Sequence, residues 1–102
     1  MTNYIYVIVR SDIEKQNQIA QACHAAVLAG NKFNQPDEVP NIVILNSKNE
    51  DDLTLLCYEL NEQGIEFESF YETEFPIGLN SICTEPISGN KRKIFKKYKL
   101  WN

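Results

Sequence analysis

The feature that most constrains the fold is an unbroken run of β-branched and aromatic residues near the start of the chain, from Tyr4 to Val9. A strand that is apolar on both faces has to be covered on both faces, so this run predicts a central strand with helices on each side. The chain has 102 residues, a length that supports one hydrophobic core and not two. We therefore expect a single domain over residues 1–102, built around this strand.

An alanine-rich helix is predicted directly after this strand, over residues 16–29. Its expected apolar face recurs at helical spacing, and its end is expected at Gly30 as the C-cap. The residues of that face are Ile19, Ala22, Cys23, Ala26 and Val27. Small side chains on such a face would let the helix approach the sheet closely.

The rest of the chain continues the alternation of strands and helices. A second strand is predicted at 41–45, and a second helix follows it, with Ser47 and Glu50 at the spacing of a capping box and Gly64 at its end. Strands are predicted at 65–71 and 79–84, and a short amphipathic helix at 91–99. The order β-α-β-α-β-β-α predicts an α/β fold, a three-layer α/β/α sandwich with a four-stranded mixed sheet.

Composition excludes several classes of protein. No apolar run approaches the roughly 18–20 residues that cross a bilayer, and the first residues lack the charged region of a signal peptide. We therefore expect a cytoplasmic protein with no membrane partner. The three cysteines, Cys23, Cys57 and Cys83, are odd in number and widely spaced. They are expected to be buried free thiols, with no disulfide, no metal site and no cofactor.

Charge is distributed unevenly along the chain. Residues 1–90 carry four basic and fourteen acidic side chains, a net charge of −10, whereas residues 91–102 carry six basic side chains and no acid, a net charge of +6. This segment, with Lys91 and Lys93 among its cations, could contact phosphates. The alternative is a solvated terminal helix that balances the acidic body.

Polar side chains at the end of the first strand form a candidate anion site. Arg10, Ser11 and Asp12 follow the strand, and Lys15 lies in the turn that enters the alanine-rich helix. Ligands of open α/β sheets gather at the carboxyl ends of the strands, where a helix N-terminus also favours an anion. The alternative is a local ion pair between Arg10 and Asp12.

Two further positions could take part in proton transfer. His24 is the only histidine, and an unperturbed imidazole titrates in the range that suits a general base, although a lone helical histidine is commonly a packed core residue. Glu72 and Glu74 lie on the same side of an extended chain, where one carboxylate could orient a water molecule. The alternative for this pair is a solvated loop.

The helix and the strand before it resemble the type 2 peptidyl-tRNA hydrolase family. The resemblance rests on the strand with its Arg10-Ser11-Asp12 end, and on the helix motif in which Ala20 and Gln21 precede His24, Ala25 and Ala26. The acidic turn at 72–74 and the segment from Asn80 to Pro86 are similar to the family's later acidic turn and last strand.

This resemblance implies a hydrolase that cleaves the ester between a peptidyl group and tRNA without a metal. It places Lys15, His24, Glu74 and Asn80 at catalytic positions. The substrate contacts expected beside them are Arg10, Asp12, Gln21, Glu72, Ser81, Lys91 and Lys93. Family members are often dimeric, so the resemblance also implies a homodimer.

The loop before the helix differs from the family pattern, because residues 14–18 are short, contain no glycine and carry one lysine. The alternative function is therefore a catalytically eroded module that binds a nucleotide or a small phosphorylated ligand on the same fold. A third reading is an interaction protein that uses exposed aromatic side chains such as Tyr71 and Phe75.

Overall fold

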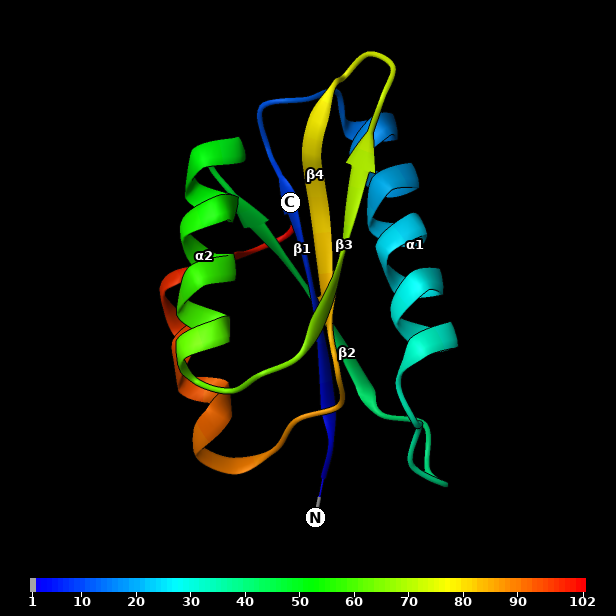
Figure 1. Cartoon of the computed structure of the whole chain (residues 1–102), viewed down its shortest axis with the longest axis vertical. Helices are drawn as coiled ribbons and strands as arrows, with labels where there is room; N and C mark the ends of the chain where they lie inside the picture. The colour runs from blue at the N-terminus through cyan, green and yellow to red at the C-terminus, as the bar shows by residue number, and fades with distance from the viewer. Residues whose placement is uncertain (1) are drawn as a thin grey trace.

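Five strands form one mixed sheet in the order β3-β4-β1-β2-β5 in the computed structural model, which describes residues 2–102 (Figure 1). The strands are β1 (Tyr4–Arg10), β2 (Asn41–Ser47), β3 (Phe67–Glu72), β4 (Gly78–Thr84) and β5 (Lys99–Leu100). Strand β1 is parallel to β2 and antiparallel to β4, while β3 and β5 pair antiparallel to β4 and β2. The predicted α/β class and mixed sheet are confirmed.

The predicted number of strands was wrong, because β5 adds a fifth strand at the edge of β2. Its two residues, Lys99 and Leu100, pair with Asn46 and Leu45. A two-residue strand within a lysine-rich segment has no alternating pattern to reveal it, so its pairing depends on tertiary contacts.

Helix α1 (Lys15–Lys32) lies against one face of the sheet, and α2 (Glu50–Glu62) and the 3-10 helix η1 (Gly89–Lys97) lie against the other (Figure 1). Strand β1 contributes to both cores. Tyr6 and Ile8 belong to the cluster on the α2 side, whereas Val7 and Val9 belong to the cluster on the α1 side. The expectation of a central strand buried on both faces is met by this alternation.

The buried face of α1 differs from the predicted one. Ile19 is 54% exposed and Val27 is 62% exposed. The residues that face the sheet are Gln18, Gln21, Ala22, Ala25 and Ala29. The apolar pattern predicted the wrong face for two reasons. It assigns glutamine to the surface, although Gln18 and Gln21 are buried, and it favours large apolar residues over the alanines that pack against the sheet. Gly30 lies inside the helix rather than at its end.

Helix α2 begins differently from the predicted capping box. Its N-cap is Asn49, whose side chain accepts a hydrogen bond from the backbone N–H of Asp52. Ser47 instead ends β2, where its hydroxyl is buried, and Glu50 binds another part of the chain. The Ser47–Glu50 spacing was therefore a chance match to the motif.

The C-terminal segment buries Phe95, as its amphipathic pattern predicts, but it forms a 3-10 helix. The Phe95 ring stacks on Tyr6 with 4.0 Å between the ring centroids. Within residues 2–102, no helix has the length and apolar character needed to cross a membrane.

All three cysteines are free, but they differ in burial. Cys83 is buried and Cys57 is half-buried, whereas Cys23 is exposed. The expectation of three buried thiols was therefore wrong for Cys23. That residue lies on the outer side of α1, with Ile19 and Val27.

Candidate active site

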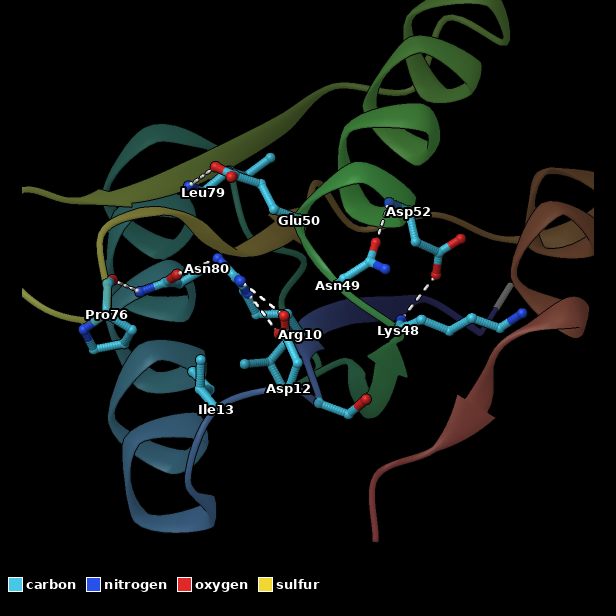
Figure 2. A network of polar contacts seen from close by, with 12 residues as sticks. Arg10, Asp12, Ile13, Lys48, Asn49, Glu50, Asp52, Pro76, Leu79 and Asn80 are labelled. Carbon is cyan, nitrogen blue, oxygen red and sulfur yellow. Dashed lines mark hydrogen bonds and ion pairs between the residues drawn. The ribbon is translucent and has the colours of Figure 1, made fainter.

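The end of the central strand carries an arginine with partners on two sides (Figure 2). Arg10 donates from Nε and Nη2 to the two carboxylate oxygens of Asp12, at 2.7 and 2.8 Å, and from Nη1 to Asn80 Oδ1, at 3.3 Å. The hydrogen bond to Asp12 is the largest influence that raises the pKa of Arg10, with the charges of Asp12 and Glu50 adding to it against the effect of burial. The same bond lowers the pKa of Asp12.

The geometry of this arginine leaves donors available for a ligand. A guanidinium has five N–H groups, and the three hydrogen bonds of Arg10 use three of them. The Arg10 side chain is 14% exposed. Its remaining N–H groups can donate to an oxygen of a carbonyl, a carboxylate or a phosphate.

Asn80 reaches Arg10 because of a bulge in β4. Phe70 pairs with Ser81 and Tyr71 pairs with Leu79, which leaves Asn80 without a partner residue on β3. Bulges redirect a side chain from the regular alternation of a strand. The Asn80 amide is fully buried and also donates from Nδ2 to the Pro76 carbonyl, at 2.8 Å. It therefore joins the β3–β4 turn to the end of β1.

Glu50 is a member of this network that the sequence analysis did not place in the site. Its Oε2 accepts a hydrogen bond from the backbone N–H of Leu79, at 2.7 Å (Figure 2). The contact joins the start of α2 to the start of β4, next to Asn80. No local pattern predicts it, because 29 residues separate the two groups.

Gln18 organises the loop between β1 and α1. Its Nε2 donates to the carbonyls of Ile13, at 2.8 Å, and Ser11, at 3.3 Å. Its Oε1 accepts from Trp101 Nε1, at 2.8 Å, and Asn46 Nδ2, at 3.2 Å. The loop that carries Asp12 is thus held from the helix, from β2 and from the end of the chain.

Lys15 is exposed at the first position of α1, and its Nζ lies 5.8 Å from the centre of the Trp101 ring. It therefore contacts the C-terminal end of the chain. No hydrogen bond or ion pair joins it to the Arg10–Asn80 pair in residues 2–102.

Gln21 and Ser81 fasten α1 to β4. Ser81 is fully buried and donates from Oγ to the Gln21 carbonyl, at 2.6 Å. Gln21 is buried as well, and its Oε1 has no hydrogen-bond partner among residues 2–102. One turn further along, the exposed His24 stacks on Phe70, with 4.5 Å between the ring centroids.

Glu72 and Glu74 lie at the turn between β3 and β4. Glu72 Oε1 accepts from the backbone N–H groups of Thr73, at 3.0 Å, and Glu74, at 3.3 Å. The Glu74 side chain is exposed, and Pro76 follows it after a cis peptide bond from Phe75. Glu72 thus shapes the turn, whereas the Glu74 carboxylate is open to solvent.

Lys91 and Lys93 lie elsewhere, in η1. Between them, the Arg92 guanidinium lies 3.4 Å from the centre of the Tyr4 ring, at the beginning of β1. Arg10 is at the opposite end of that strand, about 20 Å away at about 3.3 Å per residue. The structure therefore gathers Arg10, Asp12 and Asn80, and it separates these two lysines from them.

The arrangement offers hydrogen-bond donors and carboxylates, with no cluster of metal ligands. Within residues 2–102, no group of three histidine, cysteine, aspartate or glutamate side chains is placed to hold a metal ion. This donor set suits an oxygen-rich anionic or ester substrate.

A comparison with protein-family models identifies the family of the chain. The model of the peptidyl-tRNA hydrolase PTH2 family matches residues 4–100, which include every element from β1 to β5. The chain belongs to the PTH2 family. The resemblance inferred from the strand and the helix motif is thereby confirmed, and the match extends it to the C-terminal segment.

A solved structure shares the fold of this PTH2 member. It is a protein of unknown function from Agrobacterium tumefaciens, with a TM-score of 0.69 and 15% sequence identity, and the match covers 100% of this chain and 99% of that chain. At this identity the similarity concerns the fold alone. Comparison with curated proteins finds no significant match.

Proposed function

We propose that the protein hydrolyses the ester that joins a peptidyl group to tRNA. The observation that carries the proposal is the PTH2 family match over residues 4–100. The Arg10–Asn80 pair supports it, because a half-buried and oriented guanidinium at a strand end has free N–H groups for a substrate oxygen. The activity needs no metal in this scheme, since water is activated by a carboxylate.

In the proposed reaction, Glu74 is the general base and Arg10 is the group that stabilises negative charge. Glu74 takes a proton from water, and the water oxygen bonds to the ester carbonyl carbon. The free N–H groups of Arg10 donate to the carbonyl oxygen as it becomes negative. The bond from that carbon to the ribose oxygen then breaks, and Glu74 returns the proton to the ribose oxygen.

Other side chains position these groups. Asn80 holds Arg10 from β4, and Asp12 holds it from the loop. Ser81 and Gln21 keep α1 against β4, and His24 covers Phe70 beside them. Glu72 shapes the turn that carries Glu74. Lys15 supplies a cation for a phosphate near the end of the tRNA.

The experiment measures release of an N-acetylaminoacyl group from tRNA by the purified protein, by two site variants and by one control variant. We expect Glu74→Gln to lower kcat about 100-fold or more, the size of a general-base contribution. Arg10→Lys should also lower kcat. A lysine ammonium lacks the planar, forked set of N–H donors with which a guanidinium can bind Asp12 and the substrate at the same time. Glu62→Gln, at an exposed carboxylate at the end of α2, is the matched control and should retain full activity.

The alternative of a binding module makes a different prediction for the same samples. The binding module requires a nucleotide or tRNA to bind while the ester stays intact. Purified protein that leaves the substrate uncleaved over hours would overturn the hydrolase proposal. Shift of the melting temperature by nucleotides tests for such binding.

The homodimer and the cytoplasmic location also stay proposals. Exposed Ile19 and Val27, with Cys23 between them, give α1 an uncharged outer face that a second copy could cover. Light scattering at increasing concentration tests the homodimer, and a mass that stays near 11.8 kDa would exclude it.

A further inference from the structure

The C-terminal segment forms a strip of positive charge along one side of the molecule. We call this strip the basic track, and it consists of Lys91, Arg92, Lys93, Lys96, Lys97 and Lys99. Figure 1 shows the segment (orange to red) running beneath and beside α2 toward the middle of the sheet. The remaining 90 residues carry a net charge of −10. The track therefore concentrates most of the cations of an otherwise acidic protein.

The track is held in place by two of its own cations and by a buried ring. Arg92 Nε donates to the Tyr6 hydroxyl at 2.9 Å, and Lys97 Nζ lies 2.6 Å from Glu59 Oε1. Phe95 is buried against Tyr6. These contacts order the segment before any ligand binds, which lowers the entropic cost of binding.

The other four cations are free to meet a ligand. Lys91, Lys93, Lys96 and Lys99 are all exposed. The ion pairs found in residues 2–102 join other residues, namely Arg10 with Asp12, Lys32 with Glu68 and Lys97 with Glu59. The ordered track thus presents ammonium groups that no carboxylate neutralises by direct contact.

Two hollows lie along the track and adjoin at Tyr98. One has a volume of about 380 Å³ and is lined by Arg92, Lys93 and Lys96. The other has a volume of about 440 Å³ and joins the end of the track to Ser11, in the loop that follows Arg10. Its charged lining residues are Lys97, Lys99, Lys48, Asp52 and Glu59. The second hollow therefore leads from the basic track toward the candidate active site.

The strand pairing fixes the direction of the track. It begins where Arg92 covers Tyr4, the first residue of β1. It ends at Lys99, which pairs with Asn46, and Asn46 pairs with Val9 beside Arg10. The track therefore runs along β1 from Tyr4 to Val9, about 17 Å at about 3.3 Å per residue.

We propose that the basic track binds the sugar–phosphate backbone of the tRNA, so that the protein holds RNA well beyond the ester it cleaves. The proposal rests on the proposed function, since it takes the ester end of that RNA to lie at Arg10. A polyanion with regularly spaced phosphates matches a row of free ammonium groups about 17 Å long. The acidic remainder of the protein repels RNA and confines it to this side.

The experiment compares two substituted proteins that lose the same charge. Lys93→Ser/Lys96→Ser removes free cations of the track, and Lys32→Glu reverses the charge of an exposed lysine outside it, so each variant loses two units of positive charge. Binding of deacylated tRNA is measured by fluorescence anisotropy between 50 and 200 mM salt. Hydrolysis is measured on N-acetylaminoacyl-tRNA and on a short CCA-ended oligonucleotide that carries the same ester.

For the track variant we expect the salt slope of log K to fall by about 1.4–1.8, at about 0.7–0.9 for each lost phosphate contact. KM for the full tRNA should rise at least tenfold with kcat unchanged, and kinetics on the short substrate should not change. The Lys32 control should keep the slope within about 0.5 of the starting protein. Unchanged circular dichroism and melting temperature show that both variants fold.

Three results would overturn the proposal. They are an unchanged salt slope in the track variant, an equal loss in the Lys32 control, and an equal effect on the short and full substrates. The proposed function fails separately, if no ester is cleaved. Because the binding measurement uses deacylated tRNA, a salt slope that depends on the track would then still support RNA binding there.

Discussion

The carboxylate of Glu50 accepts a hydrogen bond from the backbone N–H of Leu79 at 2.7 Å and thereby fastens the start of α2 to the start of β4. Asn80, the next residue, turns out of the strand at a bulge and reaches Arg10. The position of the arginine therefore depends on a contact between two elements that are distant in the sequence. Gly78, the residue before Leu79, has no side chain, and this lets the Glu50 carboxylate approach the backbone closely.

Replacing Gly78 by alanine is expected to destabilise the fold by about 1–3 kcal/mol. Gly78 has a φ of +112°, and a Cβ there would collide with the Glu50 carboxylate. Urea unfolding measures the change. Gly64→Ala is the control, since Gly64 also has a positive φ, +70°, but open space around it. Equal costs at the two glycines would show that the Glu50 contact does not matter.

Gln18→Leu is expected to lower the free energy of unfolding by about 1–3 kcal/mol, because it leaves partly buried partners without a hydrogen bond. Those partners include Trp101 Nε1, so the fluorescence of this only tryptophan should report a loosened C-terminus. Gln16→Leu, at an exposed position of the same helix, is the control. A Gln18 variant as stable as the Gln16 variant would contradict this role.

One of the three thiols should react readily in the folded protein. Burial raises the pKa of Cys57 to about 11 and that of Cys83 to about 12, so both stay protonated at pH 8. Cys23 is exposed. A thiol-reactive disulfide at pH 8 should therefore label one site quickly, and three after unfolding in guanidinium. Cys23→Ser should abolish the fast reaction, and a fast phase that persists in this variant would refute the assignment.

Local patterns sufficed for the elements whose signal is continuous. The apolar run of β1 and the helix motif of α1 led to the correct fold class and family. Few folds combine a strand that is buried on both faces with a helix of that composition. The same patterns misplaced the face of α1. Gln18 is buried there because Ile13, Ser11, Trp101 and Asn46 satisfy its amide, and these partners come from three other segments.

The geometry of the candidate site could not be predicted for a similar reason. Arg10 and Asp12 are neighbours in the chain, and their pairing was weighed from the sequence. The Arg10–Asn80 contact spans 70 residues and needs a bulge, and the Glu50–Leu79 contact spans 29. Register irregularities of this kind arise from how two strands and a turn fit together, and single-residue preferences do not encode them.

The Arg10–Asp12 pair should give the stability of the protein a specific dependence on acid. The hydrogen bond from Arg10 lowers the pKa of Asp12 below its unfolded value of about 3.9. The folded state therefore binds this proton less tightly than the unfolded state. The resulting stabilisation is fully present above about pH 4 and is lost as the pH falls through the lower, folded pKa.

Asp12→Asn should remove this contribution, by up to about 1 kcal/mol because the pair is partly exposed. Urea unfolding at pH 7 and at pH 2.5 measures it. We expect the variant to be less stable than the starting protein at pH 7. The difference should shrink at pH 2.5, which lies below the unfolded pKa of about 3.9, so that the unfolded state binds the proton. Asp37→Asn, at an exposed loop carboxylate, should show no such convergence. A difference that grows toward low pH would mean that the carboxylate destabilises the fold, the opposite of what its contact with Arg10 implies.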